Sequence, residues 1–373
     1  MIYRFPDYYD EFHCIADKCE ATCCAGWQIV VDEMSLQKYK KVKKEFQERI
    51  KKGVDFKEGV FFQKEEKRCA FLNENNLCDM YIALGEDSLC ETCKRYPRHI
   101  EEFENVREFS LSVSCPEVAK ILLSKKEPVT FYEKEIEEEE EVFDDFNPML
   151  YEKLTEARQL LIELLQDRTI EMEARMALCW RFAVEFQDTM DEGILLMQES
   201  MNEHLHDIKW QSEVVAECEL WRKETESYYR DIKNLFGLLW ELEFLSDDWE
   251  DTLIETEQLL YQKGAIEYDK IQKEFLAWQI KELPEWDMIA EQLLVYFVFT
   301  YFCGSIYDEY VASKMKLAIV SVVYIREFMI AKWIKNNKVF SKQELIQIVY
   351  RYSRELEHSD ENLCTMDKLL EEL

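Results

Sequence analysis

The chain has 373 residues, 47% of them apolar and 13% aromatic, which is enough for a large folded core. Only 8 Gly and 6 Pro are present, so turns are scarce and long helices are favoured. The net charge of −32 would repel phosphate groups, which argues against a nucleic-acid partner.

The charge is unevenly placed along the chain. Residues 1–125 hold 20 basic and 23 acidic side chains, whereas residues 126–373 hold 26 and 55, a net charge of −29. Such a surface serves solubility first. It would also attract a lysine-rich protein partner.

No segment has the pattern of a leader or a membrane span. Met1–Phe12 lacks the apolar stretch of a signal peptide. The longest apolar runs, Leu293–Cys303 and Leu317–Ile325, fall short of the roughly 18 residues that suggest a span. We therefore expect a cytoplasmic protein with no membrane partner. In that reducing compartment, thirteen cysteines indicate metal ligands or catalytic groups rather than disulfides.

The N-terminal part, residues 1–125, is predicted to be an irregular, cysteine-rich metal-binding domain. Asp32–Lys52 has the pattern of one charged amphipathic helix, capped by Asp32 and ended by Gly53. A second helix is expected from Pro116 to Ser124, because proline favours the first helical turn. A bound metal would organise the short segments between these helices.

Residues 126–149 are predicted to be an acidic linker, with an unbroken acidic run at Glu137–Glu141. The remainder, 150–373, is expected to be an all-helical domain, so the fold class is mainly α. Apolar residues recur at helical spacing within Leu154–Leu165, for example, and Pro284 should break or start a helix. The same spacing recurs later in the chain, at Tyr228–Leu242 and Leu345–Tyr352.

Nine cysteines crowd the first 115 residues and carry the clearest chemical signal. Cys90 and Cys93 form a Cys-x2-Cys pair, and Cys19, Cys23 and Cys24 form a second group, as two halves of a metal site would. Such dense thiolates favour zinc or an iron–sulfur cluster, and spacing alone does not choose between them. The nine are Cys14, Cys19, Cys23, Cys24, Cys69, Cys78, Cys90, Cys93 and Cys115.

Nine thiols exceed the four that one site needs, so either two sites exist or some cysteines are free. His13 and His99 are possible extra ligands, with packing or surface roles as the alternative. The other cysteines, Cys179, Cys218, Cys303 and Cys364, are expected to be small core residues.

Standard cofactor motifs are missing from the sequence. It contains no G-x-G-x-x-G and no P-loop, so neither nucleotide loop is present.

Several motifs resemble those of the flagellin lysine-N-methylase family. The first is Cys14-Ile-Ala-Asp-Lys-Cys19-Glu-Ala-Thr-Cys23-Cys24-Ala-Gly-Trp27. Others are Cys69-Ala-Phe-Leu-Asn73, Leu89-Cys-Glu-Thr-Cys-Lys-Arg-Tyr-Pro-Arg-His99 and Arg107-Glu-Phe-Ser-Leu-Ser-Val-Ser-Cys-Pro-Glu117. Shorter stretches, Leu293–Phe297, Ile306–Asp308 and Ile325–Glu327, are similar in style.

The resemblance implies a cytoplasmic enzyme that methylates lysine side chains of flagellin with S-adenosylmethionine. It also implies a [4Fe–4S] cluster on the cysteines, with zinc as the alternative that the spacing leaves open. Two other functions stay open: a non-enzymatic, zinc-stapled binding module, and an iron–sulfur redox or electron-transfer protein.

Methyl transfer requires a neutral lysine amine, held in line with the donor methyl group. A carboxylate or tyrosine near the amine would remove its proton. Tyr96, Glu108, Tyr307 and Asp308 are candidates for this catalytic role, with packing as the alternative for each.

Arg95 and Arg98 follow the Cys-x2-Cys pair and are candidates to bind the donor's carboxylate. The competing expectation is a structural ion pair with Glu101, Glu102 or Glu104.

Overall fold

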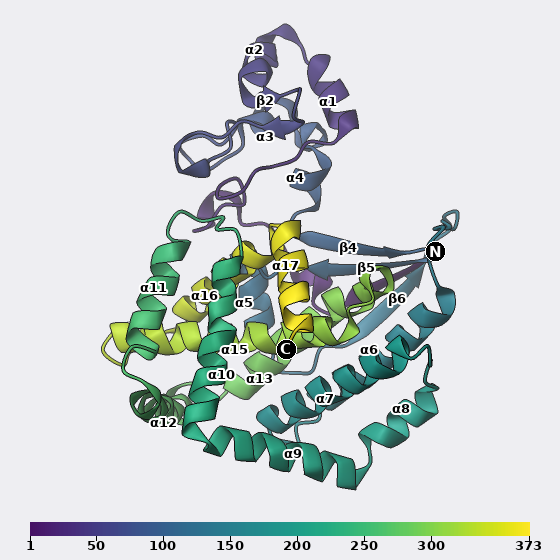
Figure 1. Cartoon of the computed structure of the whole chain (residues 1–373). Helices are drawn as coiled ribbons and strands as arrows, with labels where there is room; N and C mark the ends of the chain where they lie inside the picture. The colour runs from purple at the N-terminus through teal and green to yellow at the C-terminus, as the bar shows by residue number, and fades with distance from the viewer.

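The computed structural model describes residues 1–373, except for the side chains of Lys44 and Glu66. The fold is mainly helical, as predicted, and has three parts (Figure 1). A small lobe lies at the top of the view, a sheet lies on the right, and a large helical part fills the lower half.

The small lobe comprises residues 24–95 and has an apolar core of its own. Leu36, Tyr39, Ile50 and Phe71 are buried in that core, apart from the main core of the protein. Its elements are α1 (Glu33–Lys40), α2 (Lys44–Gly53), β2 (Val54–Asp55), β3 (Val60–Phe61), α3 (Asp79–Leu84) and α4 (Glu91–Arg95).

The predicted single helix over Asp32–Lys52 is wrong, because the chain turns at Lys41–Lys43 and forms α1 and α2 instead. A continuous helix would bring the lysines between Lys38 and Lys44 close to one another, and their like charges would destabilise it. The turn relieves this repulsion and lets α2 pack against the lobe core. The predicted ends are confirmed. The Asp32 carboxylate accepts from the Ser35 amide at 2.9 Å. Gly53 ends α2, where a side chain would overlap the Phe71 ring.

A four-stranded sheet follows the order β4-β5-β1-β6. Its central pair, β1 with β5, is parallel, and the two outer pairs are antiparallel. The strands are β1 (Ile2–Pro6), β4 (Arg98–Phe103), β5 (Val106–Leu111) and β6 (Phe131–Glu135).

The sequence did not predict this sheet, and two features concealed it. Strand β5 carries the charged pair Arg107 and Glu108, both buried, so the alternation of apolar and polar residues is lost. Strand β6 lies inside the segment predicted as a linker, and its pairing with β1 joins residues about 130 positions apart.

Glu108 fastens the sheet to the helices. Its carboxylate accepts two hydrogen bonds of 2.5 Å from Arg158 and one of 2.5 Å from Arg4 on β1. Arg158 also donates to the Phe299 carbonyl at 3.1 Å. Burial alone would raise the pKa of Glu108, but the two guanidinium groups hold it below the ordinary value of 4.5.

The C-terminal part is helical, as predicted from the apolar spacing. Its helices are α6 (Pro148–Leu165), α7 (Met172–Asp191), α8 (Gln198–Leu205), α9 (Ile208–Lys223), α10 (Thr225–Gly237), α11 (Trp249–Leu260), α12 (Ala265–Glu282), α13 (Trp286–Tyr301), α14 (Ser305–Asp308), α15 (Val311–Lys335), α16 (Lys342–Glu357) and α17 (Asp360–Glu371).

Helices α13 and α15 form the centre of the main core, and nearly every residue of both is buried. The segment Trp286–Asp308 is apolar and long enough to cross a membrane, with a mean hydropathy of 1.5 over its most apolar window. However, 89% of that window is buried inside the protein, as is usual for the core helix of a globular protein.

Other local predictions agree with the structure. Helix α5 runs from Pro116 to Ser124 as predicted, and Pro284 separates α12 from α13. Cys179 and Cys303 are buried core residues, as expected. Cys364 is a correction, because it is exposed on α17.

We expect Arg158→Met to lower the free energy of unfolding at neutral pH by about 3–5 kcal/mol, because it leaves a buried carboxylate short of a partner. Urea denaturation measures the change. The lowered pKa of Glu108 means that this stabilisation is present above its unfolded pKa and is lost as the pH falls through its folded pKa. The deficit of the variant should therefore shrink in acid.

Lys335→Met is the control for this prediction, because its ion pair with Glu255 is half exposed. Its denaturation midpoint should match that of the wild type. Equal midpoints for Arg158→Met and the wild type at pH 7 would contradict the anchoring role of Arg158.

Candidate functional site

Five cysteines gather in the small lobe, and we call them the lobe cysteines: Cys24, Cys69, Cys78, Cys90 and Cys93. All of them lie in the lobe core or pack against it. The Cys69 amide donates to the Cys24 carbonyl at 2.8 Å, and a bridge joins Leu72 to Cys78. Three segments far apart in sequence thus bring their thiols to one small core.

The other four form a second group, the junction cysteines: Cys14, Cys19, Cys23 and Cys115. Cys115 belongs to the main core and immediately precedes α5. The charge of Arg354 on α16 acts on Cys19, Cys23 and Cys115 alike, which places them where the lobe meets the helical part. Cys23 and Cys24, adjacent in sequence, connect the two groups.

Two pairs of thiols act on each other. The neighbouring Cys23 thiol lowers the pKa of Cys24 to about 7, and the Cys93 thiol lowers the pKa of Cys90. By contrast, burial raises the pKa of Cys69 to about 12. Thiols that influence each other in this way can bind one metal together once they are deprotonated.

The predicted metal centre itself is not shown. Within the described residues, no group of three or more His, Cys, Asp or Glu side chains is arranged to hold one metal ion. The predicted extra ligands lie in other contacts. The ring of His13 is exposed and bonds the Glu11 carbonyl at 3.1 Å, and His99 bonds Glu101 at 2.7 Å.

Arg354, which the sequence analysis missed, joins the junction cysteines to the helical part. Its guanidinium donates to the Ala21 carbonyl at 2.6 Å and to the Ser114 carbonyl at 3.0 Å. It thereby holds both the loop of Cys19 and Cys23 and the residue before Cys115. Nothing near Arg354 in sequence marks this role, because its partners lie 240 or more residues away.

Of the four predicted catalytic residues, Tyr96 lies beside the junction cysteines. Its hydroxyl is 3.1 Å from the Ser114 hydroxyl, and its ring packs against Trp27 and His358. Burial raises the pKa of Tyr96, and Cys115 and Cys23 add to the rise, while Arg354 opposes it.

The other three lie elsewhere. Both oxygens of Glu108 are occupied by the arginines described above. Tyr307 donates to the Glu102 carbonyl at 2.5 Å, and burial raises its pKa to about 12. Asp308 accepts from Lys314 at 2.6 Å. The structure does not bring these three together with Tyr96.

The two predicted donor-binding arginines lie apart from each other. Arg95 is exposed and approaches Glu91 on its own helix at 3.4 Å. Arg98 stacks over the rings of Tyr9 and Phe12, at 6.0 and 5.5 Å. The competing prediction, an ion pair of either arginine with Glu101, Glu102 or Glu104, is wrong for the side chains that are described. Arg107 pairs with Glu102 instead, at 3.5 Å.

A polar cluster that the sequence did not predict lies next to Tyr96. The Ser112 and Ser114 hydroxyls are 2.6 Å apart, and His358 Nε2 lies 3.0 Å from Ser114. Glu357 accepts from Ser112 and, at 2.8 Å, from Tyr296. Burial and the charge of Arg354 lower the pKa of His358 to about 3, so its ring is neutral. No local motif reveals this cluster, because it joins the segment after β5, helix α13 and the C-terminal end of α16.

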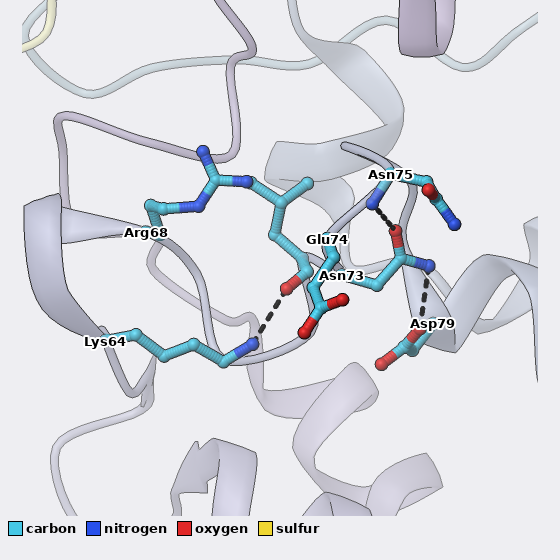
Figure 2. A pocket seen from close by; sticks show the side chains of 7 residues that line it. Lys64, Arg68, Asn73, Glu74, Asn75 and Asp79 are labelled. Atoms are coloured by element: carbon cyan, nitrogen blue, oxygen red, sulfur yellow. Dashed lines mark hydrogen bonds between the residues drawn. The ribbon is translucent and has the colours of Figure 1, made fainter.

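Two hollows are present on the surface. Figure 2 shows the smaller one, about 560 Å³, in the loop between Cys69 and Cys78. Its polar groups bond one another: Lys64 to the Leu72 carbonyl at 2.7 Å, and Asn73 to Asp79 at 3.0 Å. The larger, about 940 Å³, is lined mainly by apolar residues of α7, α9, α10, α12 and α15.

Comparison with known proteins identifies the family. The model of the FliB lysine N-methylase C-terminal domain matches residues 158–373, more than half of the chain. The chain belongs to the FliB lysine N-methylase family. The resemblance seen in the sequence is thereby confirmed.

Curated relatives of this FliB-family protein come from Salmonella. It is 27% identical over 139 residues to the lysine-N-methylases of Salmonella typhimurium and Salmonella choleraesuis. It is 28% identical over 137 residues to the flagellar biosynthetic protein FliU of Salmonella muenchen. The matches cover 35% of this chain and 35% of each lysine-N-methylase, but 81% of FliU. No solved structure matches.

We expect Arg354→Met to speed amide hydrogen exchange in residues 14–27 by at least about tenfold, since hydrogen bonds from a charged group contribute about 1.5–3 kcal/mol. Arg351→Met is the matched control, because that residue lies on the same helix but pairs with the exposed Asp248. Exchange in residues 14–27 that is the same in both variants would contradict the role assigned to Arg354.

Proposed function

We propose that this protein is a cytoplasmic protein-lysine N-methyltransferase that uses S-adenosylmethionine and acts on flagellin. Membership of the FliB lysine N-methylase family is the observation that carries the proposal. The printed names of the relatives, lysine-N-methylase and a flagellar biosynthetic protein, support the reaction and the flagellar context.

The proposal includes a [4Fe–4S] cluster held by the N-terminal cysteines. The donor chemistry fits, because nine thiols in two adjoining groups suit iron and because the thiols of two pairs act on each other's pKa. We favour a ligand set of four lobe cysteines: Cys24, Cys69, Cys90 and Cys93. The reason is that the charges of the other three thiols all act on Cys93. Bound by all four, a cluster would staple the lobe, whereas a set of only three thiolates would leave one iron open to the donor.

The acidic helical part supports a basic protein substrate. Residues 126–373 carry a net charge of −29, and an acidic field of that size raises the encounter rate with lysine-rich segments. We propose that flagellin approaches over this surface. Added salt should slow its capture, since exposed charges are screened within about 10 Å at 0.1 M.

The chain's own residues must bind the lysine, exclude water and take up its proton. Tyr96 lies closest to the cysteines among the residues predicted for this work, in the polar cluster with Ser114 and His358. We therefore place the chemistry at the junction between the lobe and the helical part. A hydrogen-bonded cluster of this kind fixes side-chain directions before the substrate arrives.

We expect protein purified without oxygen to contain about four iron and four sulfide per chain and to transfer labelled methyl groups from S-adenosylmethionine to flagellin lysines. Cys90→Ser and Cys93→Ser should lose both the iron and the activity. Cys364→Ser, at an exposed helix position, is the matched control and should keep both.

Other outcomes would decide against the proposal. Stoichiometric zinc in a colourless protein without methyl transfer would indicate a zinc-stapled binding module. A reversible redox couple without methyl transfer would indicate an electron-transfer protein.

A further inference from the structure

Glu357, at the C-terminal end of α16, is a largely buried carboxylate held by hydroxyl groups. It accepts from Tyr296 at 2.8 Å and from Ser112. Among the described side chains, no lysine or arginine forms an ion pair with it. The residue as a whole is partly exposed.

Other buried glutamates of this protein are differently compensated. Glu108 and Glu291 each bind two arginines, and Glu355 accepts from the backbone amides of Leu245 and Ser246. A buried carboxylate without a cation is costly to keep charged, and such groups concentrate at functional sites. Glu327 is the closest parallel, because it is held by the Tyr261 and Tyr268 hydroxyls, but the Gln272 side-chain amide also donates to it. Among the described residues, the hydrogen bonds to Glu357 come from hydroxyl groups, Tyr296 and Ser112, and these lie beside the junction cysteines.

The groups that face Glu357 come from several elements. Tyr296 and Tyr301 lie on α13, and His99 with its partner Glu101 lies on β4. Burial, together with the charges of Asp7 and Glu357, raises the pKa of Tyr8, which follows β1. On α17, Asp360 acts on His99 and so only indirectly on the carboxylate.

His99 alone among these groups brings positive charge toward Glu357. Burial outweighs that charge and the hydroxyl bonds, and it raises the pKa of Glu357 above the ordinary value of 4.5. The positive charge near Glu357 is thus too small to offset its burial, and the site favours a ligand that supplies more positive charge.

The carboxylate is linked to the junction cysteines by an unbroken series of contacts. Ser112, which donates to Glu357, bonds Ser114 at 2.6 Å. Ser114 in turn contacts Tyr96 and His358, and the His358 ring lies 4.6 Å from that of Trp27. The Trp27 indole then donates to the Cys23 carbonyl at 2.7 Å. An amine bound at Glu357 would lie close to the cysteine groups.

We propose that Glu357, with the hydroxyls of Tyr296 and Tyr301 beside it, binds the ammonium group of the substrate lysine and accepts its proton. This inference rests on the proposed methyl transfer and names the amine-binding site within it.

The proposed step is balanced. One N–H bond of the ammonium breaks, and its proton moves to a Glu357 oxygen, leaving a neutral amine with a lone pair. That pair forms the new N–C bond to the methyl group of S-adenosylmethionine. The S–C bond breaks, its electron pair stays on sulfur, and the donor leaves as a neutral thioether. The methylated nitrogen carries the positive charge.

The first test is Glu357→Gln, with Glu327→Gln as the matched control. Glu327 is also a buried glutamate bound by two tyrosines, Tyr261 at 2.7 Å and Tyr268 at 3.0 Å, but it lines the separate 940 Å³ cavity. At neutral pH, Glu357→Gln should lower kcat by about a hundredfold or more, the usual contribution of a general base. The loss should diminish as the pH rises toward the pKa of lysine.

The Glu327→Gln variant should keep wild-type kcat. If it loses activity while Glu357→Gln retains it, the amine site lies at the large cavity and the inference is overturned. If the wild type itself transfers no methyl groups, the proposed function fails and the inference falls with it. Equal iron content and thermal midpoints in all three proteins separate these outcomes from misfolding.

A binding measurement tests the site without the methyl donor. The probe is n-butylammonium, which matches the end of a lysine side chain, and its contact with the protein is measured by saturation-transfer NMR. The signal should be present in the wild type and in Glu327→Gln, and reduced at least fivefold in Glu357→Gln. Tyr301→Phe, a milder change should Glu357→Gln fold poorly, should weaken binding in the same direction. Undiminished binding in both variants would overturn the proposal.

Discussion

The carboxylate of Glu108 is the point at which the sheet, α6 and α13 are fastened together. Arg4 reaches it from β1, and Arg158 reaches it from α6 while also bonding a carbonyl of α13. Strand β5 then continues directly into Ser112, Ser114 and Cys115. The position of the polar cluster and of the first turn of α5 therefore depends on an ion pair several residues upstream.

This arrangement explains how a mainly helical protein builds a site from distant parts of the chain. The segment after β5 supplies serines, α13 supplies tyrosines, and α16 with the residue that follows it supplies Arg354, Glu357 and His358. None of these elements alone holds more than a fragment of the site. Such convergence is usual where rigid elements meet, since packing fixes side-chain directions better than a free loop does.

The sequence predicted the features that depend on local chemistry. Asp32 as a helix cap and Pro116 as a first-turn residue follow from backbone hydrogen bonding, and the helical part follows from apolar spacing. The cysteine pattern indicated where thiols would gather.

The missed features depend on contacts between distant residues. The sheet joins β1 with β6, and the charged residues buried on β5 disguise its pattern. Glu357 and Arg354 look like ordinary members of a charged helix until their partners are placed against them. These are Tyr296 on α13 for Glu357 and the Ser114 carbonyl, after β5, for Arg354. Tyr96 follows the Cys-x2-Cys pair directly and so lies at the junction, whereas Tyr307 and Asp308 belong to α14 in the helical part and lie elsewhere.

The placement of β1 has a consequence for synthesis on the ribosome. Strand β1 emerges before the small lobe, yet its partners β5 and β6 appear only after about a hundred further residues, with the whole lobe in between. The lobe has its own apolar core and lies between β1 and β4 as an insertion. A nascent chain must therefore keep β1 unpaired while the lobe and its thiols emerge. Any metal acquired at that stage would bind before the junction around Glu357 has formed.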